Sequence, residues 1–317
     1  MLIRPALKEY RTWTTDSRRW SGYVPRPDDI IIGTAPKCGT TWTQQIVSSL
    51  IFQDSRPHSL SDISPWIDRR FAGEVSETYA TMEEQTHRRF IKTHLPLDGV
   101  PLYDNVRYIH VARDGRDAVM SMHNHFSGYS EANRQNLDRI GLGDPLIAKP
   151  YPRVENDPAE FYRRWISTPV VPGETDGSPT ISYFGLEASD WAERRRSNVL
   201  LVHYSDLKAD LDGEMRRIAH FLAIQVNERL WPSLVDAATF EKMRQAGDEL
   251  VPHMKITLAD GPRRFFNKGT NGRWRGVLSE TDLAIYDAKV REKFTPGLAA
   301  WLGQGRLKAG DPTELPD

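Results

Sequence analysis

The strongest constraint on the fold is a short apolar run that ends in glycine and leads through a loop into a helical pattern. Residues 29–33, Asp-Ile-Ile-Ile-Gly, are typical of a strand buried on both faces. After the loop at residues 35–42, apolar residues recur at helical spacing, namely Trp42, Ile46, Val47, Leu50 and Ile51. A helix is therefore predicted to begin near Thr40. Such a strand, turn and helix N-terminus form a cradle for phosphate or sulfate, because free backbone N–H groups and the helix dipole face the anion.

The loop also carries side chains suited to an anion. Lys37 adds a full positive charge, and Thr40 and Thr41 add hydroxyl donors. Nucleotide kinases and ATPases show Gly, four residues, then Gly-Lys-Ser/Thr at such a place, whereas here the lysine lies two positions before Gly39. The loop resembles a phosphate-binding loop with a displaced lysine, and a purely structural strand-to-helix turn stays the alternative.

Three further apolar runs predict buried strands, at residues 89–92, 106–112 and 198–204. Because helix-compatible sequence lies between them, the predicted fold class is α/β, with a central parallel sheet flanked by helices on both faces, as in P-loop nucleotide hydrolases. Long stretches rich in Gly, Pro, Asp and Asn are predicted to be lid or binding loops, the alternative being plain surface excursions. These stretches are residues 128–152, 167–183 and 245–264.

The residue after the strand at 106–112 distinguishes two classes of anion site. An ATP-using enzyme closes such a strand with an acidic residue that holds Mg²⁺, but here the strand closes with Arg113. Arginine forks onto phosphate oxygens and does not bind a metal. Ser121 follows inside a predicted helix. The alternative is that Arg113 only pairs with Asp117.

Five motifs in order along the chain resemble those of the cytosolic sulfotransferases. Residues 36–42 are similar to the family's 5′-phosphosulfate loop, with Cys38 where many members have serine. The other four resemble the segment with the catalytic histidine, the 3′-phosphate motif, the Tyr-Glu-Asp-Met-Lys element and the C-terminal Arg-Lys-Gly block, and they lie at residues 92–96, 111–121, 204–208 and 267–275. The resemblance implies a single sulfotransferase domain over residues 1–317, with a core at about 28–300 and peripheral extensions at both ends.

Some positions depart from the family pattern. Asn267 stands where the family usually has arginine, which puts one 3′-phosphate contact in doubt, and Arg273 and Arg275 replace Asp and Lys. The dimer motif of the animal enzymes is not recognisable in this block. A homo-oligomer is therefore left open, with no interface assigned.

The resemblance implies transfer of a sulfuryl group from 3′-phosphoadenosine 5′-phosphosulfate (PAPS) to a hydroxyl or amine, with 3′-phosphoadenosine 5′-phosphate (PAP) as product and no metal. Negative charge builds on the leaving phosphate, so a nearby ammonium lowers the barrier. Lys37 is assigned that role and Lys92 assists at the sulfuryl oxygens, unless Lys92 is only a solvated charge at a strand end. His94 is expected to act as general base in an in-line transfer, because the reference pKa of histidine, about 6.5, lies near neutral pH.

The resemblance also implies a set of donor-binding residues. Arg113 and Ser121 are expected to hold the 3′-phosphate, together with Asn267, Lys268 and Gly269. The adenine is expected to lie among four side chains, Trp42, Tyr204, Thr239 and Phe240, although Trp42 and Phe240 also fit core positions. The phosphosulfate loop contributes Lys37, Cys38, Gly39, Thr40 and Thr41, and Cys38 is interpreted as a small structural residue rather than a nucleophile.

Composition limits the partners and the location. The formal net charge is -1, so no global field attracts nucleic acid or an anionic membrane. No long apolar stretch predicts a transmembrane segment, and the N-terminus lacks a secretory pattern, so a cytoplasmic location is expected. A small-molecule or lipid-like hydroxyl acceptor is expected over a polyanionic glycan, although arginine clusters keep the latter open. The acceptor site is expected among residues 55–89, 128–183 and 245–264.

Three histidines receive no catalytic role. His110 lies within an apolar strand and is expected in the core. His123 and His125 are assigned no chemistry, and a place for either one in the lining of the acceptor pocket is left open. Two other functions stay open as alternatives. A P-loop kinase or ATPase is suggested by the strand-loop-helix cradle, and a non-catalytic nucleotide-binding protein is suggested by Asn267.

Overall fold

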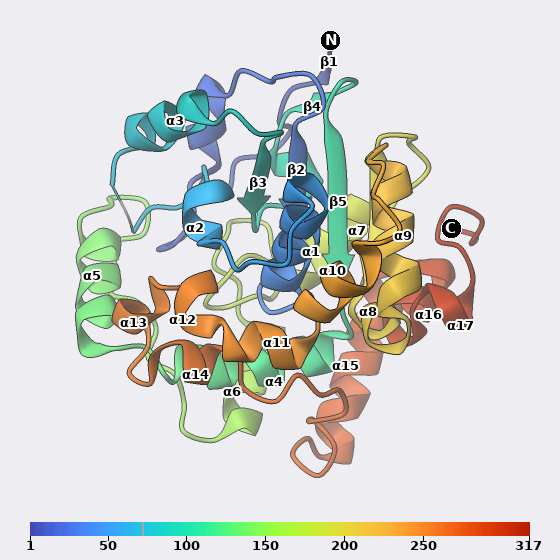
Figure 1. The fold of residues 1–317 in the computed structure, drawn as a ribbon. Coiled ribbons are helices and arrows are strands. Elements are labelled where there is room, and N and C mark those ends of the chain that lie inside the picture. Colours follow the sequence, from blue (N-terminus) through green and yellow to red (C-terminus); the bar gives the residue numbers. More distant parts are fainter. Residues whose placement is uncertain (72) are drawn as a thin grey trace.

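The protein is built around a parallel sheet (Figure 1). The computed structural model describes residues 1–71 and 73–317. The strands are β1 (Leu2–Arg4), β2 (Ile30–Gly33), β3 (Phe90–Thr93), β4 (Leu102–Tyr103), β5 (Arg107–Ala112) and β6 (Val199–His203). Four of them form the central sheet in the order β3-β2-β5-β6, and every neighbouring pair is parallel. A small antiparallel pair, β1 and β4, lies apart from it.

Helices fill the connections between the strands. The helices of the first two thirds of the chain are α1 (Thr40–Phe52), α2 (Leu60–Ile63), α3 (Val75–Glu84), α4 (Gly115–Phe126), α5 (Glu131–Leu142), α6 (Pro158–Ser167), α7 (Tyr183–Ala192), α8 (Tyr204–Ala209) and α9 (Leu211–Phe221), with the 3₁₀ helices η1 (Ser17–Gly22) and η2 (Leu97–Gly99). The remaining helices are α10 (Trp231–Ala237), α11 (Phe240–Gln245), α12 (Gly247–Leu250), α13 (Met254–Thr257), α14 (Gly261–Phe265), α15 (Glu280–Lys293), α16 (Pro296–Gln304) and α17 (Arg306–Ala309).

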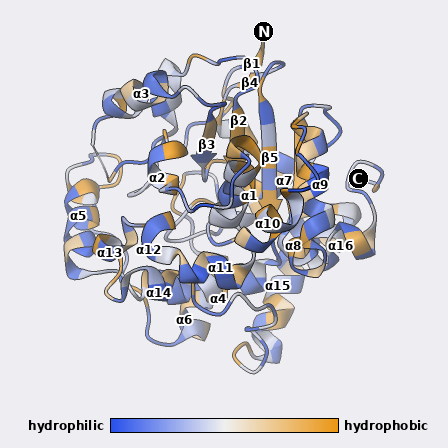
Figure 2. Cartoon of the chain, in the orientation of Figure 1, coloured by the Kyte–Doolittle hydropathy of each residue, from blue (hydrophilic) through white to orange (hydrophobic). Residues whose placement is uncertain are grey.

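The sheet is covered on both faces, which confirms the predicted α/β class. Helix α1 packs on β2 and β3 with α9 and α10 beside it, whereas α7 lies behind the sheet (Figure 1). Hydrophobic residues gather in the central strands, and peripheral helices such as α5 alternate between hydrophobic and hydrophilic residues (Figure 2). The three isoleucines of β2 are buried, as expected of a strand covered on both sides.

The predicted strands are all present, with ends shifted by about one residue. Strands β2 and β3 begin after Asp29 and Arg89, which still pair through backbone hydrogen bonds with the neighbouring strands. Their side chains form a buried ion pair, with Asp29 Oδ2 and an Arg89 terminal nitrogen 2.6 Å apart. Asp29 also accepts hydrogen bonds from the Tyr23 hydroxyl at 2.7 Å and the Arg26 amide at 2.9 Å. This pair fixes the start of the two strands.

Two of the predicted lid loops are partly helical. Residues 128–152 contain α5, because Ser130 caps its first turn by accepting a hydrogen bond from the Asn133 amide at 3.1 Å. Residues 245–264 contain the short helices α12, α13 and the start of α14. The stretch at 167–183 is largely irregular, as predicted. In the residues that the structure describes, none of the helices has the length and apolarity needed to span a bilayer.

Candidate active site

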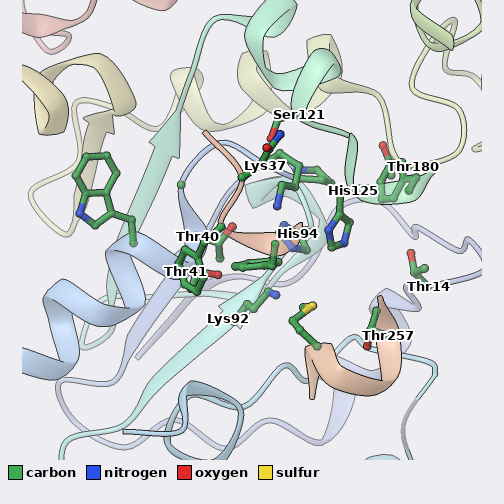
Figure 3. A pocket seen from close by; sticks show the side chains of 18 of the residues that line it. Thr14, Lys37, Thr40, Thr41, Lys92, His94, Ser121, His125, Thr180 and Thr257 are labelled. Carbon is green, nitrogen blue, oxygen red and sulfur yellow. The ribbon is translucent and has the colours of Figure 1, made fainter. Parts of the chain in front are cut away.

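The carboxyl ends of the parallel strands open into a cavity of about 220 Å³ (Figure 3). Parallel strands bring their carboxyl ends to one edge of a sheet, so residues that follow different strands meet there. The residues assigned from sequence that line this cavity are Lys37, Gly39, Thr40, Thr41, Trp42, Lys92, His94, Arg113, Ser121, Tyr204, Phe240, Asn267, Lys268 and Gly269.

The loop between β2 and α1 contains two residues with a positive φ, Lys37 and Gly39. Gly39 has a φ of 125° and precedes the first residue of α1, and a Cβ there would lie 3.2 Å from Val111 and 3.3 Å from Tyr204. Lys37 has a φ of 68°, a left-handed conformation that costs free energy in a residue with a side chain. The tight loop thus exposes the start of α1 to the cavity.

Two lysines enter the cavity, and each amine lies over an aromatic ring. The Lys37 Nζ lies 4.1 Å from the centre of the Phe265 ring, and the Lys92 Nζ lies 4.3 Å from the Trp66 ring. Burial, reinforced by the positive charges of Lys92 and Arg113, lowers the pKa of Lys37 to about 7. Burial and the charge of Arg69 lower the pKa of Lys92 to about 8. An anion between these amines would restore their positive charge.

His94 lines the same space, and only one of its two ring nitrogens is engaged by the backbone. Its Nδ1 lies 2.8 Å from the carbonyl oxygen of Thr34, so Nδ1 carries the proton and donates it to that oxygen. Nε2 is then left with a lone pair. Burial, followed by the charge of Lys92, lowers the pKa of His94 to about 3, which keeps the ring neutral. The geometry suits a hydrogen-bond acceptor or a base.

A buried carboxylate fixes the wall beside Lys92 and His94. Asp68 accepts hydrogen bonds from the Trp66 Nε1 at 2.6 Å, the Thr93 hydroxyl at 2.7 Å and the Trp20 Nε1 at 3.1 Å. The ring of Trp66 meets the ring of His94 edge-on, with centroids 4.9 Å apart. Sequence reasoning missed Asp68 and Trp66, because they lie in the unpatterned stretch at 55–89.

Arg113 organises the opposite side of the cavity. It donates hydrogen bonds to the Thr270 carbonyl and to the Asn271 side chain, both at 2.9 Å, and its guanidinium lies 4.1 Å from the centre of the Tyr204 ring. Its Nε is buried and finds no partner within residues 1–71 and 73–317. The alternative pairing with Asp117 is not formed, since Asp117 instead accepts a hydrogen bond from the Arg273 amide at 3.1 Å.

The segment around Gly269 closes over the ring of Phe240. Gly269 has a φ of 62°, and a Cβ at this position would lie 2.8 Å from that ring. The Lys208 Nζ donates to the Gly269 carbonyl at 2.6 Å, which ties the segment to α8. Trp42 points its Nε1 to the Ala238 carbonyl at 2.7 Å and meets Tyr204 edge-on at 5.2 Å.

Two residues assigned to the donor lie outside the cavity lining. Cys38 is fully buried beneath the loop, and burial raises the pKa of its thiol well above its ordinary value, which agrees with a structural role. Thr239 caps α11, where its hydroxyl donates to the Asp236 carbonyl at 2.7 Å. Both positions are set by the local turn geometry, which the sequence pattern did not resolve.

The rest of the cavity is lined by segments without a family motif. As expected, residues 55–89, 128–183 and 245–264 contribute, through Trp66, Arg69, Phe71, Tyr129, Tyr151, Thr180, Ile181, His253, Met254 and Thr257. The N-terminal segment, placed at the periphery from sequence, also contributes, through Thr12, Thr14 and Thr15. Helix α4 adds His125 and Phe126 beyond Ser121. No spacing signal in the sequence pointed to the N-terminal threonines.

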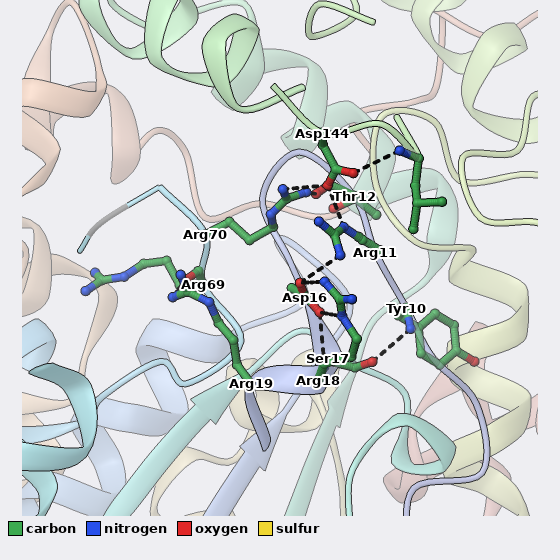
Figure 4. Close-up of polar contacts among 11 residues, drawn as sticks. Tyr10, Arg11, Thr12, Asp16, Ser17, Arg18, Arg19, Arg69, Arg70 and Asp144 are labelled. Carbon is green, nitrogen blue, oxygen red and sulfur yellow. Dashed lines mark hydrogen bonds and ion pairs between the residues drawn. The ribbon is translucent and has the colours of Figure 1, made fainter. Parts of the chain in front are cut away.

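An ion-pair cluster holds the N-terminal segment against this side (Figure 4). Asp144, which follows α5, is buried and pairs with Arg11 and, at 2.6 Å, with Arg70. Arg70 also donates to the Thr12 carbonyl. Residues from three distant parts of the chain therefore position the threonines at the cavity.

His110 is a core residue, as predicted. Its ring is buried between Glu187 at 2.8 Å and Asp190 at 3.0 Å, both on α7. These two carboxylates raise the pKa of His110 to about 10 despite its burial. The cluster joins the sheet to α7 beneath the loop.

Comparison with known proteins identifies one family. A model described as the sulfotransferase domain matches residues 27–296. The glycolipid sulfotransferase of Mycobacterium bovis is 35% identical over 315 residues, which is 94% of each chain. Rat sulfotransferase 1A1 is 26% identical over 279 residues, 85% of each chain. A mouse sulfotransferase, SULT7A1 in complex with PAP, shares the fold with a TM-score of 0.67 and 20% identity, over 91% of this chain and 92% of its own.

Proposed function

Because the chain belongs to the sulfotransferase family, we propose that it transfers the sulfuryl group of PAPS to a hydroxyl, or an amine, of a lipid-like or small-molecule acceptor. The resemblance carried by its motifs is thus confirmed at the level of the family. The observation that carries the proposal is the shared cavity, which Lys37 and Arg113 of the anion cradle line together with His94, whose Nδ1 is held by the Thr34 carbonyl so that Nε2 keeps a lone pair. A base and a donor site are needed together for this reaction.

The residues of the cradle fit the donor. Arg113 keeps a buried Nε that has no partner in the described part of the chain, which suits a phosphate oxygen. Gly269 leaves room only for backbone beside Phe240, and the backbone N–H groups at the start of α1 face the cavity. We assign the 5′-phosphosulfate to the loop with Lys37, and the 3′-phosphate to Arg113, Ser121 and Lys268. Trp42, Tyr204 and Phe240 would surround the adenine, Asn267 lines the same wall, and no direct donor contact is assigned to the Thr239 side chain.

The chemistry of the chain's own residues follows from this placement. PAPS supplies the sulfuryl group when bound. Lys37 stabilises the negative charge that develops on the leaving phosphate, and Lys92 holds the sulfuryl oxygens. His94 takes the proton of the acceptor hydroxyl at Nε2, because Thr34 holds the Nδ1–H. Asp68 keeps Trp66, and through it His94 and Lys92, in place.

Donor binding should take up protons near pH 8. Lys37 and Lys92 have pKa values lowered to about 7 and about 8, so both are partly neutral at pH 8 and charged at pH 6. An anion favours the charged amines, so PAP binding raises both pKa values and draws protons from the buffer. Calorimetry at pH 8 in buffers of different ionisation enthalpy should show this uptake, because PAP itself is then fully ionised. Lys37→Met should reduce the uptake, and identical heats in all buffers would contradict the assignment.

The relatives and the cavity favour a lipid-like acceptor. A mycobacterial relative is named a glycolipid sulfotransferase. In this chain the space beyond His94 is walled by aromatic and apolar side chains, among them Trp66, Phe126, Tyr151 and Met254. Such walls bind an apolar body while a few polar groups orient its reactive hydroxyl.

Two measurements test the proposed function. PAP should raise the melting temperature by several degrees, whereas ATP with Mg²⁺ should raise it much less, because ATP lacks the 3′-phosphate that Arg113 is assigned to bind. Radiolabelled sulfate should move from PAPS to hydroxylated lipids in a panel of acceptors, with products identified by mass spectrometry. Equal stabilisation by both nucleotides, together with ATP turnover, would favour a kinase or ATPase instead.

A further inference from the structure

His125 projects from α4 into the cavity, and none of the roles above uses it. It lies four residues after Ser121, so both side chains are on one face of the helix. Figure 3 shows its ring directed into the same space as His94 and the amine of Lys37. The placement puts a second imidazole at the reacting end of the cavity.

Aromatic rings hold His125 in this position. Its ring centroid lies 5.5 Å from those of Phe126 and Tyr129 and 5.8 Å from that of Phe265. The Phe265 ring also contacts the Lys37 Nζ, at 4.1 Å from its centre. One aromatic residue therefore separates His125 from Lys37, just as Trp66 joins His94 to Lys92.

The protonation state of His125 follows from its surroundings. Its Nδ1 is buried and has no hydrogen-bond partner anywhere in residues 1–71 and 73–317. A proton on Nδ1 would be a buried N–H without an acceptor, which is costly, so the proton belongs on Nε2. Burial and the charges of Lys37 and Lys92 lower the pKa of His125 well below its ordinary value. The ring is therefore neutral and offers one donor, Nε2–H.

The two histidines are thus complementary. His94 keeps its proton on Nδ1, bonded to the Thr34 carbonyl, and offers a lone pair at Nε2. His125 keeps its proton on Nε2 and offers an N–H. A single hydroxyl needs only the lone pair of His94, so the donor of His125 remains for another oxygen.

We propose that the Nε2–H of His125 donates a hydrogen bond to a second oxygen of the acceptor, next to the hydroxyl that His94 deprotonates. The inference rests on the proposed function and narrows its acceptor to a polyhydroxylated head group, such as a sugar ring. His125 then selects which hydroxyl receives the sulfuryl group. Threonine hydroxyls at the same cavity, of Thr14, Thr180 and Thr257, supply further polar contacts for such a ring (Figure 3).

His123 supplies a matched control on the same helix. Its Nε2 lies 2.9 Å from the Glu155 carbonyl, so its ring already has a hydrogen-bond partner. It packs on Phe161 at 5.6 Å and is not among the residues that line the cavity. Replacing it removes a histidine from α4 without removing a cavity donor.

The test uses two acceptors with the same tail, octyl β-D-glucopyranoside and octan-1-ol, with PAPS as donor. His125→Phe keeps an aromatic ring but removes the N–H, and His125→Gln restores an N–H donor. We expect His125→Phe to lower kcat/KM for the glucoside about tenfold, mainly through KM, and to spread sulfate over several hydroxyls. His125→Gln should recover part of this loss, and His123→Phe should change the ratio of the two acceptors less than twofold.

The outcomes separate this inference from the proposed function. Equal changes for both acceptors in His125→Phe, or no change, would overturn the role of His125 while transfer by the wild type still supported the function. If the wild type sulfated octan-1-ol but not the glucoside, the proposed contact between His125 and a second acceptor oxygen would be wrong. Transfer to neither compound nor to any hydroxylated lipid would contradict the function itself. A rise in melting temperature with PAP verifies that each variant is folded. If His125→Phe shows no such rise, the ratio of kcat/KM for the glucoside to that for octan-1-ol is taken from His125→Gln instead.

Discussion

Replacing His94 with alanine is expected to lower sulfuryl transfer about 10²- to 10⁴-fold while PAP still binds. The Nε2 lone pair of His94 is the base assigned to the acceptor hydroxyl, because Nδ1 is held by the Thr34 carbonyl at 2.8 Å. The ring packs edge-on against Trp66, and the donor is assigned to other residues, so its loss should leave the cradle intact. Initial rates with saturating PAPS, and the PAP-dependent rise in melting temperature, measure the two effects separately.

The pH dependence gives a second view of the same residue. The pKa of His94 is lowered to about 3, so the ring stays neutral as the pH falls from 8 to 5. Loss of rate over that range should therefore not come from protonation of His94 in the free enzyme. His220→Ala removes an exposed histidine of α9 and serves as control. A His94→Ala variant with more than a tenth of the wild-type rate would exclude His94 as the base.

Replacing Asp29 with alanine is expected to destabilise the fold by about 3–5 kcal/mol. Asp29 and Arg89 are both 1% exposed and share two hydrogen bonds, at 2.9 and 2.6 Å. Removal of the carboxylate leaves the buried Arg89 guanidinium with only the exposed Glu83 carboxylate, 3.3 Å away, and it also removes the acceptor of the Tyr23 hydroxyl. The lost interactions lie where β2 and β3 begin, in the central sheet. The midpoint of chemical denaturation should therefore shift clearly to lower denaturant concentration.

The comparison with an exposed pair isolates the effect of burial. Glu228 pairs with Arg216 at 2.8 Å, but both side chains are largely exposed. Glu228→Ala should leave the denaturation midpoint almost unchanged, because exposed ion pairs contribute little. Replacing both members of the buried pair, as Asp29→Leu with Arg89→Met, should recover much of the lost stability, since no uncompensated charge remains. A midpoint for Asp29→Ala equal to that of Glu228→Ala would show that the pair is dispensable.

The donor side of the cavity was predictable because its residues follow strands. Lys37, Lys92, His94 and Arg113 each lie within or directly beyond an apolar run. A parallel sheet brings all such positions to one edge, so their proximity follows from the order of strands and helices alone. The helix at α1 was equally predictable, since the apolar spacing after Thr40 is local.

The acceptor side depends on contacts that no local pattern carries. Thr12 and Thr14 reach the cavity because Arg11 and Arg70 converge on Asp144, and these residues are far apart in the sequence. The role proposed for His125 depends on the burial of its Nδ1 and on its contact with Phe265, which belongs to another helix. Side-chain burial and the pairing of distant charges are properties of the packed chain.

The α/β class, the family and the strand-end residues that line the cavity could thus all be read from the sequence. Three features appear only once the chain is packed: Cys38 and Thr239 do not line the cavity, N-terminal threonines do, and His94 and His125 present opposite tautomers to one space. Periodicity and motifs encode which face of an element is buried, whereas the partners of a buried polar group are fixed only when distant segments pack together.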